Sequence, residues 1–291
     1  MAEFENEHVY EGIVMSNYFP AWALDRIKET VLDDSDILIA TYPKCGTTWM
    51  QEIVYQVQTE GDFEGSDEKP LYNRFNFLEE NEETPNIEAG LKRFEVDKPP
   101  RFIKTHLYSH FYKKTLENKK TKIIVVFRNP KDMLVSYFHF YRMLDYDFDS
   151  NGSWEDFFTL FKNNKLSHGS YFDMQLSWWA YKDNARVKFF KYEDMLKDPE
   201  QAVRQVAAFL EKDLSDELIQ KIVERTSFKS MKDNPMLNYS TCPGLDFKVS
   251  PFMRKGKVGD WKNYFTEEQS QYVEKMSEIK LKPAGIVLED L

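Results

Sequence analysis

ILIATYPKCGTTW occupies residues 37–49 and joins a short apolar run to a turn with one glycine and then to a helical pattern. The run over 37–42 predicts a strand buried on both faces, and the pattern over 47–58 predicts a helix. The first N–H groups of such a helix lack partners, and its dipole favours an anion. Lys44 supplies a cation here, and Thr47 and Thr48 supply hydroxyl donors. This stretch therefore predicts a phosphate-binding strand, loop and helix, although a plain turn with an exposed lysine would show the same spacing. The lysine precedes the glycine, so the loop differs from the nucleotide-triphosphate P-loop, G-x-x-x-x-G-K-[ST].

The rest of the chain alternates between strand-like and helix-like patterns. Further strands are predicted at 101–105, 122–127 and 186–190, and helices at 132–143, 199–210, 213–226 and 267–279. This alternation predicts an α/β fold with a central, mainly parallel sheet flanked by helices, whose ligands bind outside the carboxyl ends of the strands. Residues 58–100 are acidic and rich in turn formers, which predicts a surface excursion with short helices. Such a segment could form a lid over a binding site. No interdomain linker is evident, so residues 1–291 are expected to form a single domain.

Composition narrows the classes of partner. The formal net charge of −10 argues against a nucleic-acid partner, and an anionic ligand would need a local cluster of cations. Two cysteines, Cys45 and Cys242, do not make a disulfide framework. The sequence shows neither a signal peptide nor an apolar run long enough to span a membrane, so we expect a cytoplasmic protein with no membrane partner.

Charged side chains also follow two of the other predicted strands. Lys104 and His106 end the second strand on one side of the chain, because side chains alternate along a strand. Arg128 ends the third strand, and Ser136 follows in the next predicted helix. FMRKGKVGDW, residues 252–261 and here called the basic loop, brings further cations and two glycines. Taken singly, these features could be a structural histidine, a surface Arg–Asp pair and a solvated loop. Taken together, the features predict two phosphate sites and a base.

Six segments resemble the cytosolic sulfotransferase family. They are YPKCGTTW, FIKTHL, VVFRNPKDMLVSYFHFY, FFKYEDM, TSFKSMKDNPMLNYS and FMRKGKVGDWKNYFT, which follow the family's order over about residues 37–265. The combination of YPKxGTTW with RKGxxGDW is highly specific. The resemblance implies an enzyme that moves a sulfonate group from 3′-phosphoadenosine 5′-phosphosulfate (PAPS) to a hydroxyl of a small, apolar acceptor, leaving adenosine 3′,5′-bisphosphate (PAP).

The resemblance also implies a role for each residue. Lys44 would contact the bridging oxygen of the phosphosulfate, His106 would be the general base, and Lys104 would steady the sulfonate. Ser136, counted with these three as catalytic, would hold the 3′-phosphate together with Arg128. The full set expected to bind the donor is Lys44, Cys45, Gly46, Thr47, Thr48, Trp49, Arg128, Ser136, Tyr192, Thr226, Phe228, Phe252, Met253, Arg254, Lys255 and Gly256.

Elementary chemistry agrees with this assignment. Sulfonate transfer is an in-line displacement, similar in its demands to phosphoryl transfer. A histidine with a pKa of about 6.5 can draw the proton from an acceptor hydroxyl at neutral pH. The leaving group is a good one, and the five histidines do not fall at zinc spacings, so no metal is expected.

The acceptor pocket is expected to be largely aromatic, which favours a phenol, a steroid or another apolar alcohol over a sugar polymer. Its expected residues are Phe19, Phe75, Phe77, Lys104, His106, Phe140 and Tyr239, with Tyr18 and residues 245–249 nearby. The sequence does not name the natural acceptor or say whether amines are sulfonated.

Three departures from the family pattern matter. Cys45 stands where relatives often have serine, so its backbone N–H is expected to bind the donor, and its thiol beside a phosphate could be redox-sensitive. Residues 108–111 replace a Pro-Leu-rich turn at one wall of the pocket. The family's dimer segment, K-x-x-x-T-V-x-x-x-E, is altered at Glu267 and Gln271, so we expect a monomer or a weak homodimer.

Two other functions would account for part of the pattern. A P-loop kinase is disfavoured because the Gly-Lys-Ser/Thr ending and a clear strand-terminal aspartate for magnesium are missing. A non-catalytic protein that binds a nucleotide or a hydrophobic ligand would not need the base, yet His106, Lys44 and Lys104 are all present.

Overall fold

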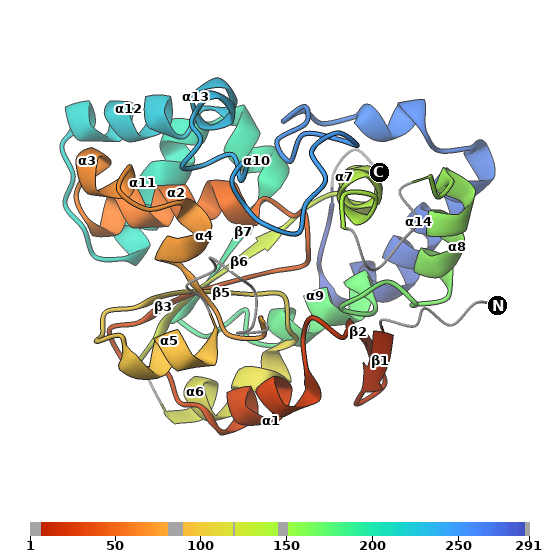
Figure 1. The fold of residues 1–291 in the computed structure, drawn as a ribbon, viewed down its shortest axis with the longest axis horizontal. Helices are drawn as coiled ribbons and strands as arrows, with labels where there is room; N and C mark the ends of the chain where they lie inside the picture. Colours follow the sequence, from red (N-terminus) through yellow and green to blue (C-terminus); the bar gives the residue numbers. More distant parts are fainter. Residues whose placement is uncertain (1–6, 81–89, 119, 145–150, 289–291) are drawn as a thin grey trace.

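A five-stranded parallel sheet forms the centre of the computed structural model, which describes residues 7–80, 90–118, 120–144 and 151–288 (Figure 1). Its strand order is β4-β5-β3-β6-β7, and every pairing is parallel. The α/β prediction is therefore confirmed. The strands are β3 (Ile37–Thr41), β4 (Asn76–Phe77), β5 (Phe102–Thr105), β6 (Lys122–Phe127) and β7 (Val187–Lys191).

The four strands predicted from apolar runs are all present, and each boundary lies within one residue of its prediction. Strand β4 was not predicted because two residues are too few to show a period. The small antiparallel hairpin of β1 (Glu7–Tyr10) and β2 (Ile13–Ser16) was also missed.

Helices cover both faces of the sheet, which accounts for its continuous apolar strands. Along β3, Ile37 and Ile39 pack into one core cluster with α2, α11 and α12, whereas Leu38 and Ala40 pack into the other with α1, α7 and α9. Figure 1 shows α2, α11 and α12 side by side on one side of the sheet. The helices of the first cluster are α2 (Thr47–Gln58), α4 (Leu71–Arg74), α10 (Tyr192–Lys197), α11 (Pro199–Phe209), α12 (Asp216–Arg225) and α13 (Phe228–Asp233).

The remaining helices surround the second cluster or lie at the rim. They are α1 (Ala21–Glu29), α3 (Phe63–Ser66), α5 (Leu91–Val96), α6 (Lys113–Asn118), α7 (Pro130–Tyr141), α8 (Trp154–Lys162), α9 (Tyr171–Trp179) and α14 (Glu267–Lys280), with short 3-10 turns at Ser109–Tyr112, Asp260–Asn263 and Lys282–Ala284. No described helix is both long and apolar enough to cross a membrane.

Capping side chains set several helix starts. Asp198 accepts a hydrogen bond from the Gln201 N–H, and Pro199 follows in the first turn of α11. Helix α7 begins two residues before its predicted start, because the Asn129 side chain caps it ahead of Pro130. Helix α14 begins with a full capping box formed by Thr266 and Gln269.

Residues 58–100 form short helices, as predicted, but they are not only a surface excursion. Segment 81–89 lies outside the described residues, whereas Leu71, Phe75 and Leu78 are fully buried and β4 extends the sheet. The composition was misleading because the acidic residues lie around an apolar stretch that packs inward.

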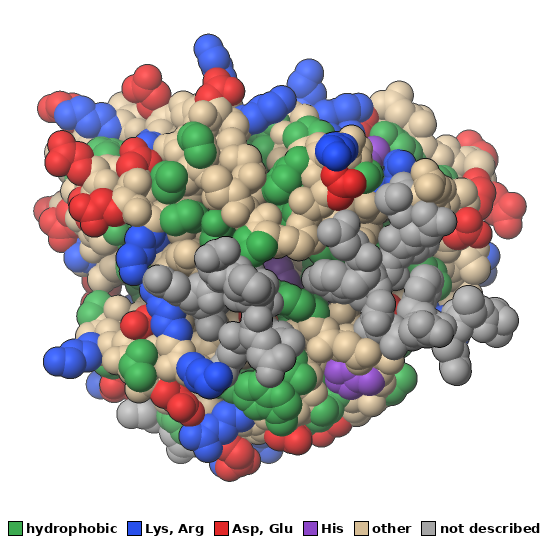
Figure 2. All heavy atoms as spheres, in the orientation of Figure 1, with side chains coloured by type: hydrophobic (Ala, Val, Ile, Leu, Met, Phe, Trp, Pro, Cys, Tyr) green, Lys and Arg blue, Asp and Glu red, His purple; other side chains and the backbone are tan. Residues whose placement is uncertain are grey.

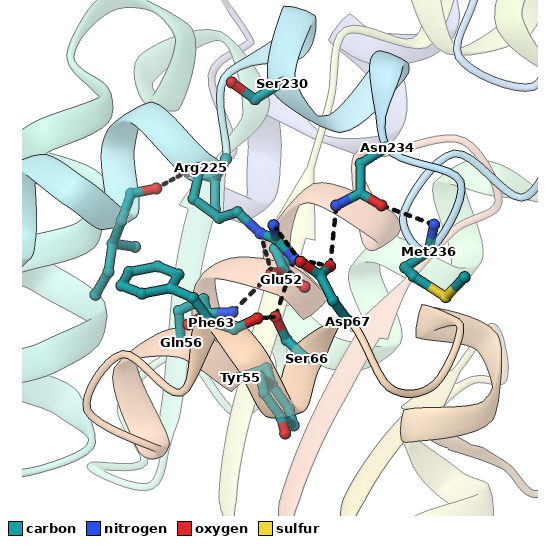
Figure 3. A network of polar contacts seen from close by, with 12 residues as sticks. Glu52, Tyr55, Gln56, Phe63, Ser66, Asp67, Arg225, Ser230, Asn234 and Met236 are labelled. Atoms are coloured by element: carbon teal, nitrogen blue, oxygen red, sulfur yellow. Dashed lines mark hydrogen bonds and ion pairs between the residues drawn. The ribbon is translucent and has the colours of Figure 1, made fainter.

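A network of ion pairs and hydrogen bonds around Glu52 connects this segment to α2 and α12 (Figure 3). Glu52 of α2 has no exposed surface and accepts hydrogen bonds from Arg74 Nη2 at 2.6 Å, Gln56 Nε2 at 2.9 Å and Arg225 Nε at 3.3 Å. Arg225, at the end of α12, also pairs with Asp67 at 2.5 Å. The network therefore connects α2, α4, α12 and the turn after α3.

Candidate active site

A cavity of about 460 Å³ lies at the carboxyl ends of β3, β5 and β6, the edge at which parallel sheets bind their ligands. Residues that follow all three strands line it, together with the basic loop and residues of α10 and α13. Figure 2 shows a histidine side chain within a hollow near the middle of this face.

The turn between β3 and α2 has the geometry of an anion site. Lys44 and Gly46 both have positive φ angles, of 66° and 97°, and helix α2 starts at Thr47. A Cβ atom on Gly46 would lie 2.7 Å from the Tyr192 ring, so this position requires glycine. The first helical bond is from the Met50 N–H to the Gly46 carbonyl, at 3.0 Å. The N–H groups of residues 46–49 therefore precede the helical ladder and are available to an anion.

Cys45 does not take the part expected of it. Its side chain is fully buried in the core and is not among the lining residues, and its N–H donates to the Tyr42 carbonyl at 3.2 Å. Burial raises the pKa of the thiol well above its usual value, so the thiol stays protonated and unreactive. The expectations of a Cys45 donor contact and of redox sensitivity there are corrected accordingly.

Lys44 places its ammonium group inside the cavity between aromatic rings. Its Nζ lies 3.8 Å from the Phe252 ring centre and 4.4 Å from that of Phe140. Burial, together with the nearby charges of Arg128, Lys104 and Arg254, lowers the pKa of Lys44 to about 7. An anion bound among these cations would favour the protonated form of the lysine.

Arg128 is held at the exit of β6 with part of its guanidinium free. Its Nη1 donates to the Lys44 carbonyl at 2.8 Å, and its guanidinium lies 4.3 Å from the Tyr192 ring centre. Its Nε is buried without a hydrogen-bond partner among the described residues. The alternative of a surface Arg–Asp pair is wrong, because Asp132 instead accepts the N–H groups of Gly259 at 2.6 Å and Trp261 at 3.1 Å.

Asp132 thereby anchors the basic loop against α7. Within the loop, Asp260 pairs with Arg254 and with Lys255, each at 2.5 Å. These contacts lower the pKa of Asp260 to about 2, against the opposing effect of its partial burial. Residues 252–257 of the loop line the cavity, as does Ser136 of α7. The loop therefore holds its cations at the cavity, although Lys255 and Lys257 remain exposed.

Lys104 and His106 stand together at the exit of β5, as strand alternation predicts. Lys104 pairs across the sheet with Phe77, and its Nζ lies 4.1 Å from that ring centre. Burial opposes a charge on Lys104, but the neighbouring Tyr239 and Glu80 outweigh burial and raise its pKa. Lys104 therefore remains an ammonium.

The ring of His106 has a defined tautomer. Its Nδ1 lies 2.8 Å from the Thr41 carbonyl, which can only accept a hydrogen bond, so Nδ1 carries the proton and Nε2 carries the lone pair. The backbone N–H of His106 donates to Glu79 Oε1 at 2.7 Å, and this hydrogen bond holds the residue that follows β5 in place. Burial, aided by His168 and Lys104, lowers the pKa of His106 well below 6.5. The imidazole is consequently neutral.

The structure brings together nearly every residue singled out in the sequence. Apart from Cys45, the whole expected donor set lines the cavity, and so do Phe19, Phe77, Phe140 and Tyr239. Phe75 is the exception in the acceptor set, since it is fully buried and packs on Phe102, with ring centres 5.2 Å apart. Phe75 is the C-cap residue of α4 and lies outside β4, where it packs into the core, whereas Phe77 belongs to β4 and lines the cavity.

Several lining residues were missed, chiefly Gln51, Glu80, His168 and Cys242. Gln51 could have been found, because it lies one helical turn after Thr47 on the same face of α2. Glu80 and His168 follow no predicted strand, and no local pattern marks them. Tyr18 donates to Glu80 Oε1 at 2.7 Å, and burial raises the pKa of that carboxyl group.

The described residues contain no group of three or more His, Cys, Asp or Glu side chains placed to hold a metal ion.

Comparison with known proteins agrees with these features. The family described as "Sulfotransferase domain" matches residues 34–285. Sulfotransferase 1C2 of Oryctolagus cuniculus is 41% identical over 253 residues, which cover 86% of this chain and 84% of the relative. Sulfotransferase 1A1 of Bos taurus is 39% identical over 279 residues, covering 94% of this chain and 93% of the relative.

Two solved structures are similar over nearly the whole chain. Retinol dehydratase in complex with androsterone and the inactive cofactor PAP is 27% identical, with a TM-score of 0.86, and the match covers 97% of this chain and 91% of that one. Mouse sulfotransferase SULT7A1 complexed with PAP is 30% identical, with a TM-score of 0.77 and coverages of 96% and 95%.

Proposed function

This chain belongs to the sulfotransferase family and is a PAPS-dependent sulfotransferase, and on that premise we propose that it sulfonates a hydroxyl of a small apolar acceptor with His106 as the general base. The observation that carries the proposal is the His106 ring. Its Nδ1 is bound to the Thr41 carbonyl, so the basic Nε2 is available in a cavity that also holds the ammonium groups of Lys44 and Lys104.

The cavity has separate features for the two ends of the donor. The turn that begins α2 offers unpaired N–H groups and Lys44 to the phosphosulfate. Arg128 and Arg254 each have a buried Nε without a partner among the described residues, and both line the cavity with Ser136. Buried guanidinium groups left incomplete in this way suit a phosphate, which we assign to the 3′ position. Trp49, Tyr192, Thr226 and Phe228 would surround the adenine.

The residues account for each change in bonding. His106 Nε2 takes the proton of the acceptor hydroxyl as the new bond from oxygen to sulfur forms. The bond between sulfur and the phosphate oxygen breaks, and Lys44 stabilises the negative charge that develops on that oxygen. Lys104 stabilises the sulfonate oxygens during transfer. The products are the sulfonated acceptor and PAP, and the proton remains on His106 until water removes it.

The acceptor end of the cavity supports an apolar molecule. Phe19 and Phe77 lie edge to face with ring centres 5.6 Å apart, and Phe77 also packs on His106 at 5.4 Å. Phe140 and Tyr239 complete the aromatic lining. Androsterone and retinol, which occupy structures of similar proteins, are acceptor-sized molecules of this apolar kind.

Replacing His106 tests the base. We expect His106→Ala to lose about 10²–10⁴-fold in turnover, because a positioned base contributes that much, while its affinity for PAP stays unchanged. The assay is transfer of labelled sulfonate from PAPS to a panel of phenols, steroids and aliphatic alcohols, with PAP binding measured by calorimetry.

His110→Ala is the matched control. His110 lies four residues further on, its side chain is 44% exposed, and it is not among the lining residues, so this variant should keep full activity. Full turnover by His106→Ala would show that the base is assigned wrongly. Tight PAP binding with no transfer to any acceptor by the wild type would favour the non-catalytic binding protein.

The single domain over 1–291, the cytoplasmic location and the oligomeric state stay predictions. In the altered dimer segment, Gln271 donates to Glu267 on the exposed face of α14 at 3.0 Å, within one chain. Sedimentation over a range of concentrations would separate a monomer from a weak homodimer.

A further inference from the structure

Asp67, the residue that follows α3, hydrogen-bonds to residues on both sides of the short helix α13 (Figure 3). Its Oδ1 accepts from Asn234 Nδ2 at 3.0 Å, and Asn234 is the residue at which α13 is capped at its C-terminus. Its two oxygens also accept from Arg225 Nη1 at 3.1 Å and Nη2 at 2.5 Å. Arg225 is the last residue of α12 and lies just ahead of α13. One carboxylate therefore joins the two ends of α13.

Asp67 is charged at neutral pH. Partial burial opposes its charge, but the hydrogen bonds from Arg225 and Asn234 outweigh this effect and lower the pKa of the carboxyl group. A further contact lies close by, since the Leu71 N–H donates to the Met236 carbonyl at 2.7 Å. The segment between α3 and α4 is thus attached to the chain before α13 and to the chain after it.

Helix α13 forms part of the wall of the cavity. Phe228 and Met231 line it, as does Thr226 just before the helix. A Cβ atom on Gly256 would lie 2.2 Å from the Phe228 ring, so α13 packs directly against the basic loop. Asp67 is not among the described residues that line the cavity, and its side chain is 46% exposed. Any effect of Asp67 on a ligand must therefore act through α13.

The position of α13 depends on its contacts with the rest of the chain. The helix has six residues, too few to be stable alone in water. Ser227 caps its start by accepting from the Ser230 N–H, but that hydrogen bond is local and does not orient the helix toward the cavity. The hydrogen bonds of Asp67 connect both of its ends to a distant segment, and charge-assisted bonds of this kind are among the stronger ones.

We propose that Asp67 is a positioning residue for the base of the donor nucleotide, and that it acts by holding α13 so that Phe228 faces the base. The inference rests on the proposed function, which places the adenine against Thr226 and Phe228. Without the carboxylate, α13 would sample more orientations, and a base could bind only to the fraction with the right one. Lys44 and Arg128 follow β3 and β6, so the contacts assigned to the phosphates should not change.

The test measures two ligands by calorimetry, PAP and ribose 3,5-bisphosphate, which lacks the base. We expect Asp67→Ala to bind PAP about tenfold more weakly, which corresponds to the loss of about one hydrogen bond to a charged group, and to bind the ribose bisphosphate like the wild type. In turnover, the KM for PAPS should rise by the same factor while kcat stays unchanged. Asp67→Asn, which keeps one acceptor oxygen, should lose less affinity for PAP.

Glu60→Ala is the matched control. It breaks an exposed ion pair with Lys212, at 2.9 Å, shortly before α3, and it leaves the contacts of α13 intact. Its affinity for PAP should equal that of the wild type. Equal losses for PAP and the ribose bisphosphate in Asp67→Ala, or wild-type PAP affinity in both Asp67 variants, would overturn the role of Asp67.

A double-mutant cycle with Phe228→Ala separates this inference from the proposed function. Phe228→Ala alone should weaken PAP binding, and adding Asp67→Ala should then weaken it little further, because the ring that Asp67 positions is already gone. Fully additive losses would show that Asp67 does not act through Phe228 and would contradict the inference alone. Wild-type PAP affinity in Phe228→Ala would instead refute the adenine site in the proposed function, and the inference with it.

Discussion

Replacing Glu52 by glutamine should reveal how much the fold depends on the network in Figure 3. Glu52 is fully buried and is the carboxylate that pairs with Arg74, whose side chain is only 4% exposed. The Nε and Nη1 atoms of Arg74 already lack partners among the described residues. Glu52→Gln would therefore leave a buried guanidinium without its counter-charge.

The expected loss of unfolding free energy is about 3–5 kcal/mol, the usual cost of breaking a buried ion pair from one side. For a domain of this size, 1 kcal/mol corresponds to roughly 2 °C in Tm, so the variant should melt about 6–10 °C lower. The broken contact between residue 52 and Arg225 should add little to this loss, because Arg225 keeps its ion pair with Asp67 at 2.5 Å.

Thermal unfolding followed by circular dichroism measures the effect, with two companion variants. The double variant Glu52→Gln, Arg74→Met removes both charges and should be more stable than Glu52→Gln alone, since no unpaired charge stays buried. Glu217→Gln, which breaks the exposed pair with Lys221, should leave Tm unchanged. A Tm for Glu52→Gln within about 2 °C of the wild type, or a double variant less stable than the single, would refute the reasoning.

Three other predictions concern the donor site. Because burial lowers the pKa of Lys44 to about 7, the free enzyme loses this charge above that pH, and calorimetry should show PAP affinity falling from pH 7 to 9. The variant Lys44→Arg should not show this fall. An equal fall in the wild type and the variant would count against a role for Lys44. Gly256→Ala should weaken PAP binding about tenfold, since the added Cβ would lie 2.2 Å from Phe228. Gly259 also has a positive φ angle, but a Cβ there would meet no atom within 4 Å, so Gly259→Ala should bind PAP normally. Equal losses of affinity in the two variants would contradict this prediction. Cys45 should resist alkylation by iodoacetamide in the folded protein, as peptide mass spectrometry would show, and rapid labelling there would disprove its burial.

Much of the fold and of the donor site follows from local sequence. The strands at 37–42 and 122–127 are apolar because they are buried on both faces, and the residues after them converge because all the strands of the central sheet run parallel. Lys44, Arg128 and His106 could be found for that reason. Each lies at a strand exit, and strand exits are recognisable within a few residues.

Other features depend on segments that meet only in the folded chain. Glu52, Arg74 and Arg225 are ordinary charged residues in the sequence, and their burial in one network results from the packing of three helices. Phe75 and Phe77 are alike in the sequence, but Phe75 at the end of α4 packs into the core and Phe77 in β4 lines the cavity.

The sequence alone determined four of the five strands of the sheet and the charged residues at the strand exits, because periodicity and turn chemistry are local. Only the tertiary structure decided that His168 stands beside His106, that Cys45 is buried, and that Asp132 anchors the basic loop. Those positions are set by contacts between residues far apart in the chain, where local pattern carries no information.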